Sequence, residues 1–320
     1  MRRSAHTPSP FRNSEHTSTI TGPSIQSALL NIWRHSDPND RALYLISAGL
    51  ALSGLAHLGV QLVAGGSWDG PVSWRKPTTF GLTLATLTWV TSFIRLSFGA
   101  RRALLAVFAL ACIAEVAVIT LQAWRGVPSH FNVSTPLNAT LAYTAAAGGA
   151  VIVVLTLVLF TASLRPNAAV PPSMRLAVRA GFLTFLSALA IGVFMIALGV
   201  TTTRTVSQAA AYTVASAFKA GHAATMHGIL ILPTLAWLTT FTLWTEGRRV
   251  RVVTLACAAY VLAAGTVVVD VFTAINPLSL RGAPLVNTLL GVAGALGLLI
   301  AYTLTLLSVR QNGSLHKRGP

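Results

Sequence analysis

Residues 221–238 read GHAATMHGILILPTLAWL, an apolar run that opens with two histidines, His222 and His227. A helix that crosses a membrane needs about 20 predominantly apolar residues, and this run has that length and composition. Because lipid offers the backbone no hydrogen-bonding partners, a crossing segment must be helical or belong to a closed barrel. The chain lacks the alternating pattern of a barrel strand, so we expect an all-α membrane bundle with polar side chains inside it.

The composition supports a membrane protein. Of the 320 residues, 53% are hydrophobic and only 9% are charged, whereas soluble proteins carry roughly 25% charged residues. The formal net charge of +16 comes from basic residues in short segments between apolar stretches. That distribution sets membrane topology, so we expect the lipid bilayer, and no nucleic acid, as partner. The abundance of Arg over Lys, and of Ala, Val and Gly, indicates a bacterial protein.

Eight apolar stretches are long enough to cross a bilayer, and together they form an expected transmembrane domain over residues 42–309. We place them near residues 42–65, 78–98, 103–123, 138–163, 178–199, 222–244, 253–275 and 285–308. Residues 1–41 lack the apolar core of a signal peptide and are predicted to be a disordered cytoplasmic tail, with an interfacial helix over 25–36. Residues 310–320 are predicted to form a second cytoplasmic tail.

Orientation follows from the distribution of basic residues. Most of the 23 lysines and arginines fall on the side that holds both termini, so the positive-inside rule places both termini in the cytoplasm. The localisation predicted for the chain is therefore the bacterial cytoplasmic membrane. Two segments of the chain resemble each other, TLTWVTSF (86–93) and TLAWLTTF (234–241), and each is followed by an arginine pair. Both segments run inward, which favours two parallel four-helix repeats.

Ionisable side chains within the predicted spans are the first candidates for function. Charged groups at that depth are costly and usually face a bundle interior or cavity. At about 1.5 Å per residue, His57, Glu115, His227 and Asp270 fall at similar depths below the outer surface. We expect them to line one outward-opening cavity, with Glu115 and Asp270 as proton-transfer residues. Gln122 shares a helix face with Glu115.

The outer loops supply a cationic rim. Arg75, Lys76, Arg125 and Arg281 lie on the outer side, against the usual bias, which favours a role as anion ligands or as partners of acidic side chains. The outer loops over residues 66–77 and 122–132 also contain polar and aromatic candidates: Asp69, Trp74, Ser129, His130 and Asn132.

The histidines leave two cofactor hypotheses open. A b-type haem held between His57 and His227 would place its propionates near Arg75, Arg125 and Arg281. A transition metal on His222, His227 and His130 is the alternative. His222 and His227 are about 140° apart around a helix, so they share a metal only if the helix begins after His222.

Three motifs resemble a group of uncharacterised bacterial multi-pass membrane proteins: WRKPTTFG (74–81), QAWRGVPSHFN (122–132) and GHAATMHGILILPTLAWL (221–238). The resemblance spans about the first three-quarters of the chain and implies no activity. It does imply a set of site residues: Arg125, Ser129, His130, Asn132, His222 and His227. The eight-span haem A synthases have an ExxxH pattern that is missing here, since Glu115 is followed four residues later by Ile119.

Three function classes follow from these residues. The first is a membrane protein binding a b-type haem or metal. The second is a proton-coupled transporter or receptor for a small anionic solute, and the third is an intramembrane enzyme acting on a lipid or isoprenoid through Glu115 and Asp270. The sequence does not indicate an oligomeric state.

Overall fold

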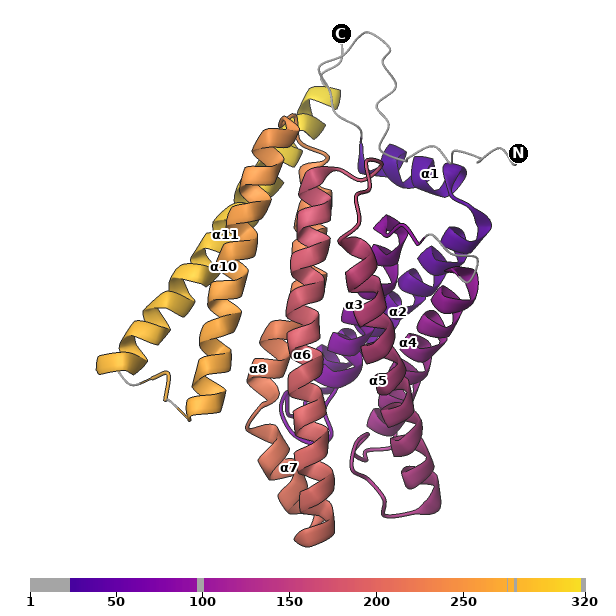
Figure 1. Cartoon of the computed structure of the whole chain (residues 1–320), viewed down its shortest axis with the longest axis vertical. Coiled ribbons are helices and arrows are strands. Elements are labelled where there is room, and N and C mark those ends of the chain that lie inside the picture. Colours follow the sequence, from indigo (N-terminus) through magenta and orange to yellow (C-terminus); the bar gives the residue numbers. More distant parts are fainter. Residues whose placement is uncertain (1–23, 97–100, 275, 279–280, 318–320) are drawn as a thin grey trace.

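The computed structural model describes residues 24–96, 101–274, 276–278 and 281–317, and all regular secondary structure in these ranges is helical (Figure 1). The helices of the first half are α1 (Ile25–His35), α2 (Pro38–Ala64), α3 (Arg75–Val90), the 3-10 turn η1 (Thr91–Phe93), α4 (Arg101–Trp124) and α5 (Pro136–Ser163). Those of the second half are α6 (Pro172–Thr205), α7 (Gln208–Ser216), α8 (Lys219–Met226), α9 (Gly228–Thr239), α10 (Glu246–Thr273) and α11 (Gly282–Lys317).

Six helices of the described residues are long and apolar enough to cross a membrane: α2, α4, α5, α6, α10 and α11. The predicted helical membrane bundle is therefore confirmed. The helix predicted over residues 25–36 is present as α1, which lies across one end of the bundle (Figure 1). The tail before it, residues 1–23, lies outside the described residues. At the other terminus α11 continues past residue 309 to Lys317.

Two of the predicted crossing helices are shorter than expected. The stretch predicted over 78–98 ends its α-helix at Val90 and its 3-10 turn at Phe93. The stretch predicted over 222–244 is not one helix, because it breaks at His227 between α8 and α9. Gly228 follows the break, and glycine is a poor helix former. Both short segments pack within the bundle, where α3 contacts α2, α4 and α9.

Helix starts follow local capping chemistry. Asp37 accepts a hydrogen bond from the Asn39 backbone N–H before α2, and Thr135 accepts one from the Asn138 N–H before α5. Each cap is followed directly by proline, whose missing N–H costs nothing at the first helical position. These caps place the start of α5, and therefore the wall that it contributes to the site described below.

Helices α2 and α3 cross at a pair of glycines. A Cβ atom on Gly81 would lie 2.8 Å from the Cα atom of Gly54, and one on Gly54 would lie 2.9 Å from the carbonyl oxygen of Thr78. Small residues at such crossings let helix backbones approach closely inside a membrane. The crossing fixes the position of α3, whose first turn carries Arg75 and Lys76.

The two similar sequence segments, 86–93 and 234–241, pack against each other. The rings of Trp89 and Trp237 lie edge to face with centroids 6.1 Å apart. Each tryptophan also packs on the phenylalanine four residues later, Trp89 on Phe93 at 5.1 Å and Trp237 on Phe241 at 4.8 Å. The contact between α3 and α9 is thus made by corresponding residues in nearly the same local geometry.

Candidate functional site

A cavity of about 470 Å³ lies among α3, α4, α5, α6, α7 and α8. Its volume is within the range of small-molecule pockets, roughly 300–1,000 Å³. Most of its wall is apolar, and its polar side chains are Arg75, Lys76, Thr83, Glu115, His130, Tyr212, Lys219 and His222. Residues from four separate parts of the sequence therefore meet at one cavity.

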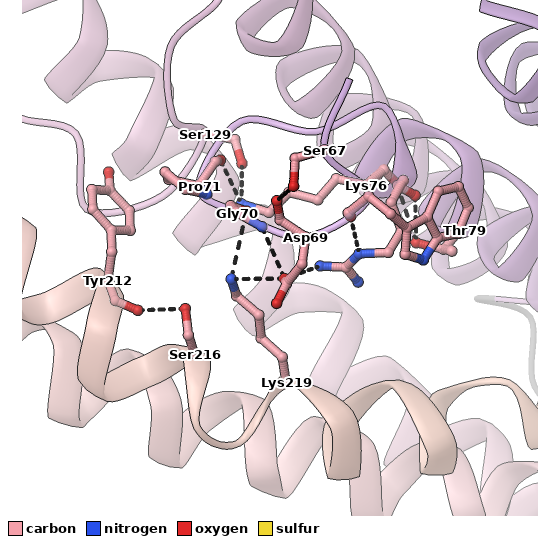
Figure 2. Close-up of polar contacts among 12 residues, drawn as sticks. Ser67, Asp69, Gly70, Pro71, Lys76, Thr79, Ser129, Tyr212, Ser216 and Lys219 are labelled. Carbon is pink, nitrogen blue, oxygen red and sulfur yellow. Dashed lines mark hydrogen bonds and ion pairs between the residues drawn. The ribbon is translucent and has the colours of Figure 1, made fainter. Parts of the chain in front are cut away.

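Cations converge on the loop between α2 and α3 (Figure 2). The Lys219 ammonium lies 3.4 Å from Oδ1 of Asp69 and 3.5 Å from the carbonyl oxygen of Gly70. The Arg75 guanidinium lies 3.7 Å from the same Asp69 oxygen and donates through Nε to the carbonyl oxygen of Trp68 at 3.0 Å. Two cations therefore share a single carboxylate.

Lys76 has a different set of partners. Its ammonium donates to the carbonyl oxygen of Pro71 at 3.3 Å and to Oγ of Ser129 at 3.5 Å, and both acceptors are neutral (Figure 2). Among the residues that the structure describes, no carboxylate lies within ion-pair distance of this ammonium. Lys76 is thus a cation at the cavity wall whose hydrogen-bond acceptors are neutral.

A polar chain leads from Lys76 to the buried carboxyl of Glu115. Because an ammonium can only donate, Ser129 accepts a hydrogen bond from Lys76 and can donate one from its hydroxyl group to Nδ1 of His130, 2.8 Å away. The imidazole proton then sits on Nε2, which lies 3.8 Å from Oε1 of Glu115. That separation is too long for a direct hydrogen bond but short enough for electrostatic coupling.

Glu115 is buried at the far end of this polar chain. It is 5% exposed, and its Oε2 atom has no hydrogen-bond partner within the described part of the chain. A buried acceptor without a partner costs roughly 1–3 kcal/mol, more if charged, so it marks a place where the protein gives up stability. Such a group is a candidate proton carrier.

The loop groups have shifted acid–base properties. Burial lowers the pKa of His130 to about 3, and the nearby Lys76 and His222 act in the same direction, so the imidazole is neutral near pH 7. A hydrogen bond from the Gly70 backbone N–H, with the charges of Lys219 and Arg75, holds the pKa of Asp69 below its usual range. Asp69 is therefore ionised and the cationic end is only partly neutralised.

The loop that carries His130 is held in an unusual conformation. The next residue, Phe131, has a φ of 57°, a left-handed conformation that bulky residues rarely adopt. Tyr212 donates its hydroxyl proton to the carbonyl oxygen of His130, and its ring packs on Phe131 with centroids 5.8 Å apart. The Phe131 ring lies against Gly199, where a Cβ atom would come within 2.4 Å of it. These contacts from α6 and α7 position His130 over the cavity.

His222 also lines the cavity, and its Nδ1 atom lies 2.8 Å from the carbonyl oxygen of Ala188. If Nδ1 carries the proton, Nε2 is left as an acceptor. His227 sits at the break between α8 and α9 and is not part of the cavity wall.

His57 is part of an aromatic clasp outside the cavity. Its Nε2 atom accepts from the indole N–H of Trp124 at 3.0 Å, and its Nδ1 atom lies 2.6 Å from the carbonyl oxygen of Ser53. The ring stacks on Trp74 at 6.0 Å, and Trp74 packs edge to face on Trp124 at 4.9 Å. With both ring nitrogens hydrogen-bonded, His57 joins α2, α3 and α4.

Arg125, Gln122 and Asn132 shape the loop between α4 and α5. Arg125 donates to the side-chain oxygens of Gln122 and Asn138, and Gln122 donates to Asn138 at 3.3 Å. Asn132 accepts from the Ser134 hydroxyl at 2.7 Å. None of the three predicted residues is in the cavity wall. The specific QAWRGVPSHFN motif is therefore accounted for mainly as a folded loop that presents His130.

Asp270 and Arg281 lie away from the cavity. Asp270 accepts from the Asn287 amide at 2.7 Å across α10 and α11, and Arg281 is exposed. Glu115 and Asp270 therefore do not act on one site. The predicted metal ligands His130, His222 and His227 do not form a ligand set either, since the described residues contain no group of three or more His, Cys, Asp or Glu side chains placed to hold a metal.

Sequence reasoning missed Lys219, Tyr212 and Phe131 as site residues. Lys219 lies two residues before the motif that begins at Gly221, on the side predicted to be the outer one, and that position was a usable signal. Tyr212 and Phe131 carried no signal, because their roles depend on how α7 packs against the loop after α4.

No protein-family model matches this chain, and neither the curated proteins nor the solved structures contain a significant match to it.

Proposed function

We propose that this protein is a proton-coupled receptor or transporter for a small anionic ligand in the bacterial cytoplasmic membrane. The observation that carries the proposal is the meeting of Arg75, Lys76 and Lys219 at one end of a cavity that also holds a buried carboxyl. The cations come from two distant segments, so their meeting is a product of folding. Glu115 is the proposed proton carrier, with His130 between it and the cations.

The charge balance of the cavity favours an anion. Arg75 and Lys219 share the single carboxylate of Asp69, and Lys76 has only neutral partners. Holding cations away from water without counter-ions is costly, and a bound anion offsets that cost. A carboxylate or phosphate placed beside Lys76 would also accept charge-assisted hydrogen bonds, which are stronger than neutral ones.

Proton coupling follows from the position of Glu115. An anion beside the cations adds negative charge near this carboxyl, and a nearby like charge disfavours ionisation. Glu115 would therefore hold its proton more firmly when the anion binds, and it would take up at most one proton at a pH at which it is ionised in the free protein. The Oε2 atom without a partner is the natural site for that proton.

The proposal includes eight membrane crossings with both termini in the cytoplasm. Six crossings are the long apolar helices, and the other two are α3 with η1 and α8 with α9. The excess of basic residues on the side of the termini supports this orientation. In Figure 1, α1 and α7 lie at opposite ends of the bundle, so the cationic end near α7 would face outward.

We also propose that the bundle is two parallel four-helix units, α2–α5 and α6–α11. Besides the tryptophan contact, the pair Gln122–Asn138 between α4 and α5 corresponds to Asp270–Asn287 between α10 and α11 at nearly constant spacing along the chain. Both pairs brace two helices. The second unit has alanine where the first has Glu115, so only the first unit carries the proton site.

The test is direct anion binding. Purified protein in phosphatidylcholine nanodiscs would be dialysed to equilibrium against radiolabelled butanoate, with empty discs as blank. We expect saturable binding that weakens at least about tenfold in Lys76→Gln, equivalent to roughly 1.4 kcal/mol. Arg281→Gln is the matched control, since it removes an outer cation that is exposed and outside the cavity.

Coupling would be measured in the same discs as proton uptake on butanoate addition in weakly buffered dye solution. Glu115→Gln should abolish uptake while retaining anion binding. Equal losses of binding in Lys76→Gln and Arg281→Gln would refute the proposed site, and unchanged proton uptake in Glu115→Gln would refute the coupling.

A further inference from the structure

The cavity separates charge from apolar surface along the axes of its helices. On α3, Arg75 and Lys76 stand in the first turn, while Phe80 and Leu84 line the cavity one and two turns further on. Leu84 is eight residues beyond Lys76, which places it about 12 Å deeper along the helix. The α3 wall is thus charged at one end and mainly apolar at the other, where Thr83 is its one polar side chain among the cavity-lining residues of α3 that the structure describes.

Helix α8 repeats this gradient on the opposite wall. Lys219 begins the helix, His222 follows one turn later, and Met226 ends it, and all three line the cavity. The spacings of three and four residues keep them on one helix face. The α3 and α8 walls come from distant parts of the sequence, and both carry their cations in the first turn and an apolar side chain further along.

The apolar part of the cavity exists because several side chains of α5 and α6 that face it are small. The α5 wall begins with small residues, Ala145, Ala146, Gly149 and Ala150, before Ile152 and Val153, and Gly192 lies on the α6 wall. Larger side chains at these positions would fill the space. Aliphatic and aromatic groups such as Phe185 and Leu189 close the remainder.

We infer that the ligand is an amphipathic anion with a single apolar chain, its carboxylate or phosphate on Lys76 and Lys219 and its chain between α5 and α6. The inference rests on the proposed function and adds the class of ligand. A compact anion such as inorganic phosphate would leave the apolar part of the cavity without a partner. A chain would remove that surface from water, which stabilises the complex in proportion to its length.

The primary measurement is the dependence of binding affinity on the length of the ligand's apolar chain, and it needs no variant of the protein. Binding of butanoate, octanoate and dodecanoate to the wild-type protein in nanodiscs would be compared by equilibrium dialysis, corrected with empty discs. We expect affinity to rise by up to about fourfold for each added methylene until the cavity is filled. Equal affinities across the series would overturn the inference and leave the anion site itself intact.

A matched pair of variants on α5 locates the chain. Ala146 lines the cavity and the adjacent Ala147 does not, although both side chains are exposed. Ala146→Trp should weaken dodecanoate binding at least tenfold while butanoate binding stays within twofold, and Ala147→Trp should change neither. A chain-length dependence that survives in Ala146→Trp would place the chain elsewhere and overturn the inference.

Two sources could supply such an anion, the bilayer or the aqueous phase. Discs prepared with lysophosphatidate, a single-chain anionic lipid, would be tested for displacement of labelled dodecanoate. Displacement supports a ligand taken from the membrane, while binding of dodecanoate without displacement supports one taken from water. If butanoate binding is unchanged in both Lys76→Gln and Lys219→Gln, the anion site is refuted, and the proposed function with it.

Discussion

Replacing Gly81 with alanine tests whether the α2–α3 crossing sets the geometry of the cationic end. The new methyl group would lie 2.8 Å from the Cα atom of Gly54, 2.9 Å from its nitrogen and 2.9 Å from the carbonyl oxygen of Leu50. All three atoms belong to the backbone of α2, so no side chain can rotate away. The two helices must move apart.

The cost can be estimated from overpacking. Ordinary contact begins near 3.4 Å, so the backbones would separate by about 0.5 Å, and overpacking of this kind costs roughly 1–3 kcal/mol. Alanine also favours helix formation over glycine by about 1 kcal/mol, which partly offsets that cost. Gly59→Ala on α2 carries the same helical gain with nothing within 4 Å of the new atom. The difference between the two variants therefore isolates the crowding.

The free energy of unfolding would be measured by titrating detergent-solubilised protein with sodium dodecyl sulfate and following helicity and tryptophan fluorescence. We expect Gly81→Ala to be less stable than Gly59→Ala by about 1–3 kcal/mol. Butanoate binding should also weaken in Gly81→Ala, because α3 begins with Arg75 and Lys76. Equal stability of the two variants would refute the close crossing and the argument that it positions the cations.

Three further outcomes follow from the site. Because burial lowers the pKa of His130 from 6.5 to about 3, the unfolded chain binds a proton more readily. Stability should then fall as the pH drops below 6.5, by up to about 2 kcal/mol at pH 5, and His130→Gln should remove most of that dependence in unfolding titrations. Trp124→Phe, which deletes the donor to His57, should lower the unfolding free energy by about 1 kcal/mol in the same assay; no change would mean that the clasp contributes nothing. Gly199→Ala would force the Phe131 ring to move, so it should cost about 1–3 kcal/mol and weaken butanoate binding, and wild-type values for both would contradict the loop packing described here.

Much of the candidate site was accessible from sequence because ionisable residues are so expensive inside a membrane. Glu115 was selected on that basis, Arg75 and Lys76 because they lie on the predicted outer side against the usual charge bias, and His130 and His222 as candidate metal ligands. The structure places all five in the cavity wall.

The same reasoning failed for side chains whose partners lie on other helices. Depth gives no information about which way a helix faces, so His57 and Asp270 were assigned to the cavity, although they join helices elsewhere. Arg125 looked like a free outer cation, but its guanidinium is bound to Gln122 and Asn138.

By itself, the sequence determined the helical membrane class, the approximate positions of the apolar segments and the resemblance between residues 86–93 and 234–241. These properties depend on composition and local order, because lipid imposes one backbone solution on any long apolar segment. Tertiary structure alone decided the break at His227, the recruitment of Lys219 and the separation of Glu115 from Asp270. Helix rotation and crossing distance control those features, and they are set by contacts such as Gly54 on Gly81 between residues far apart in the chain.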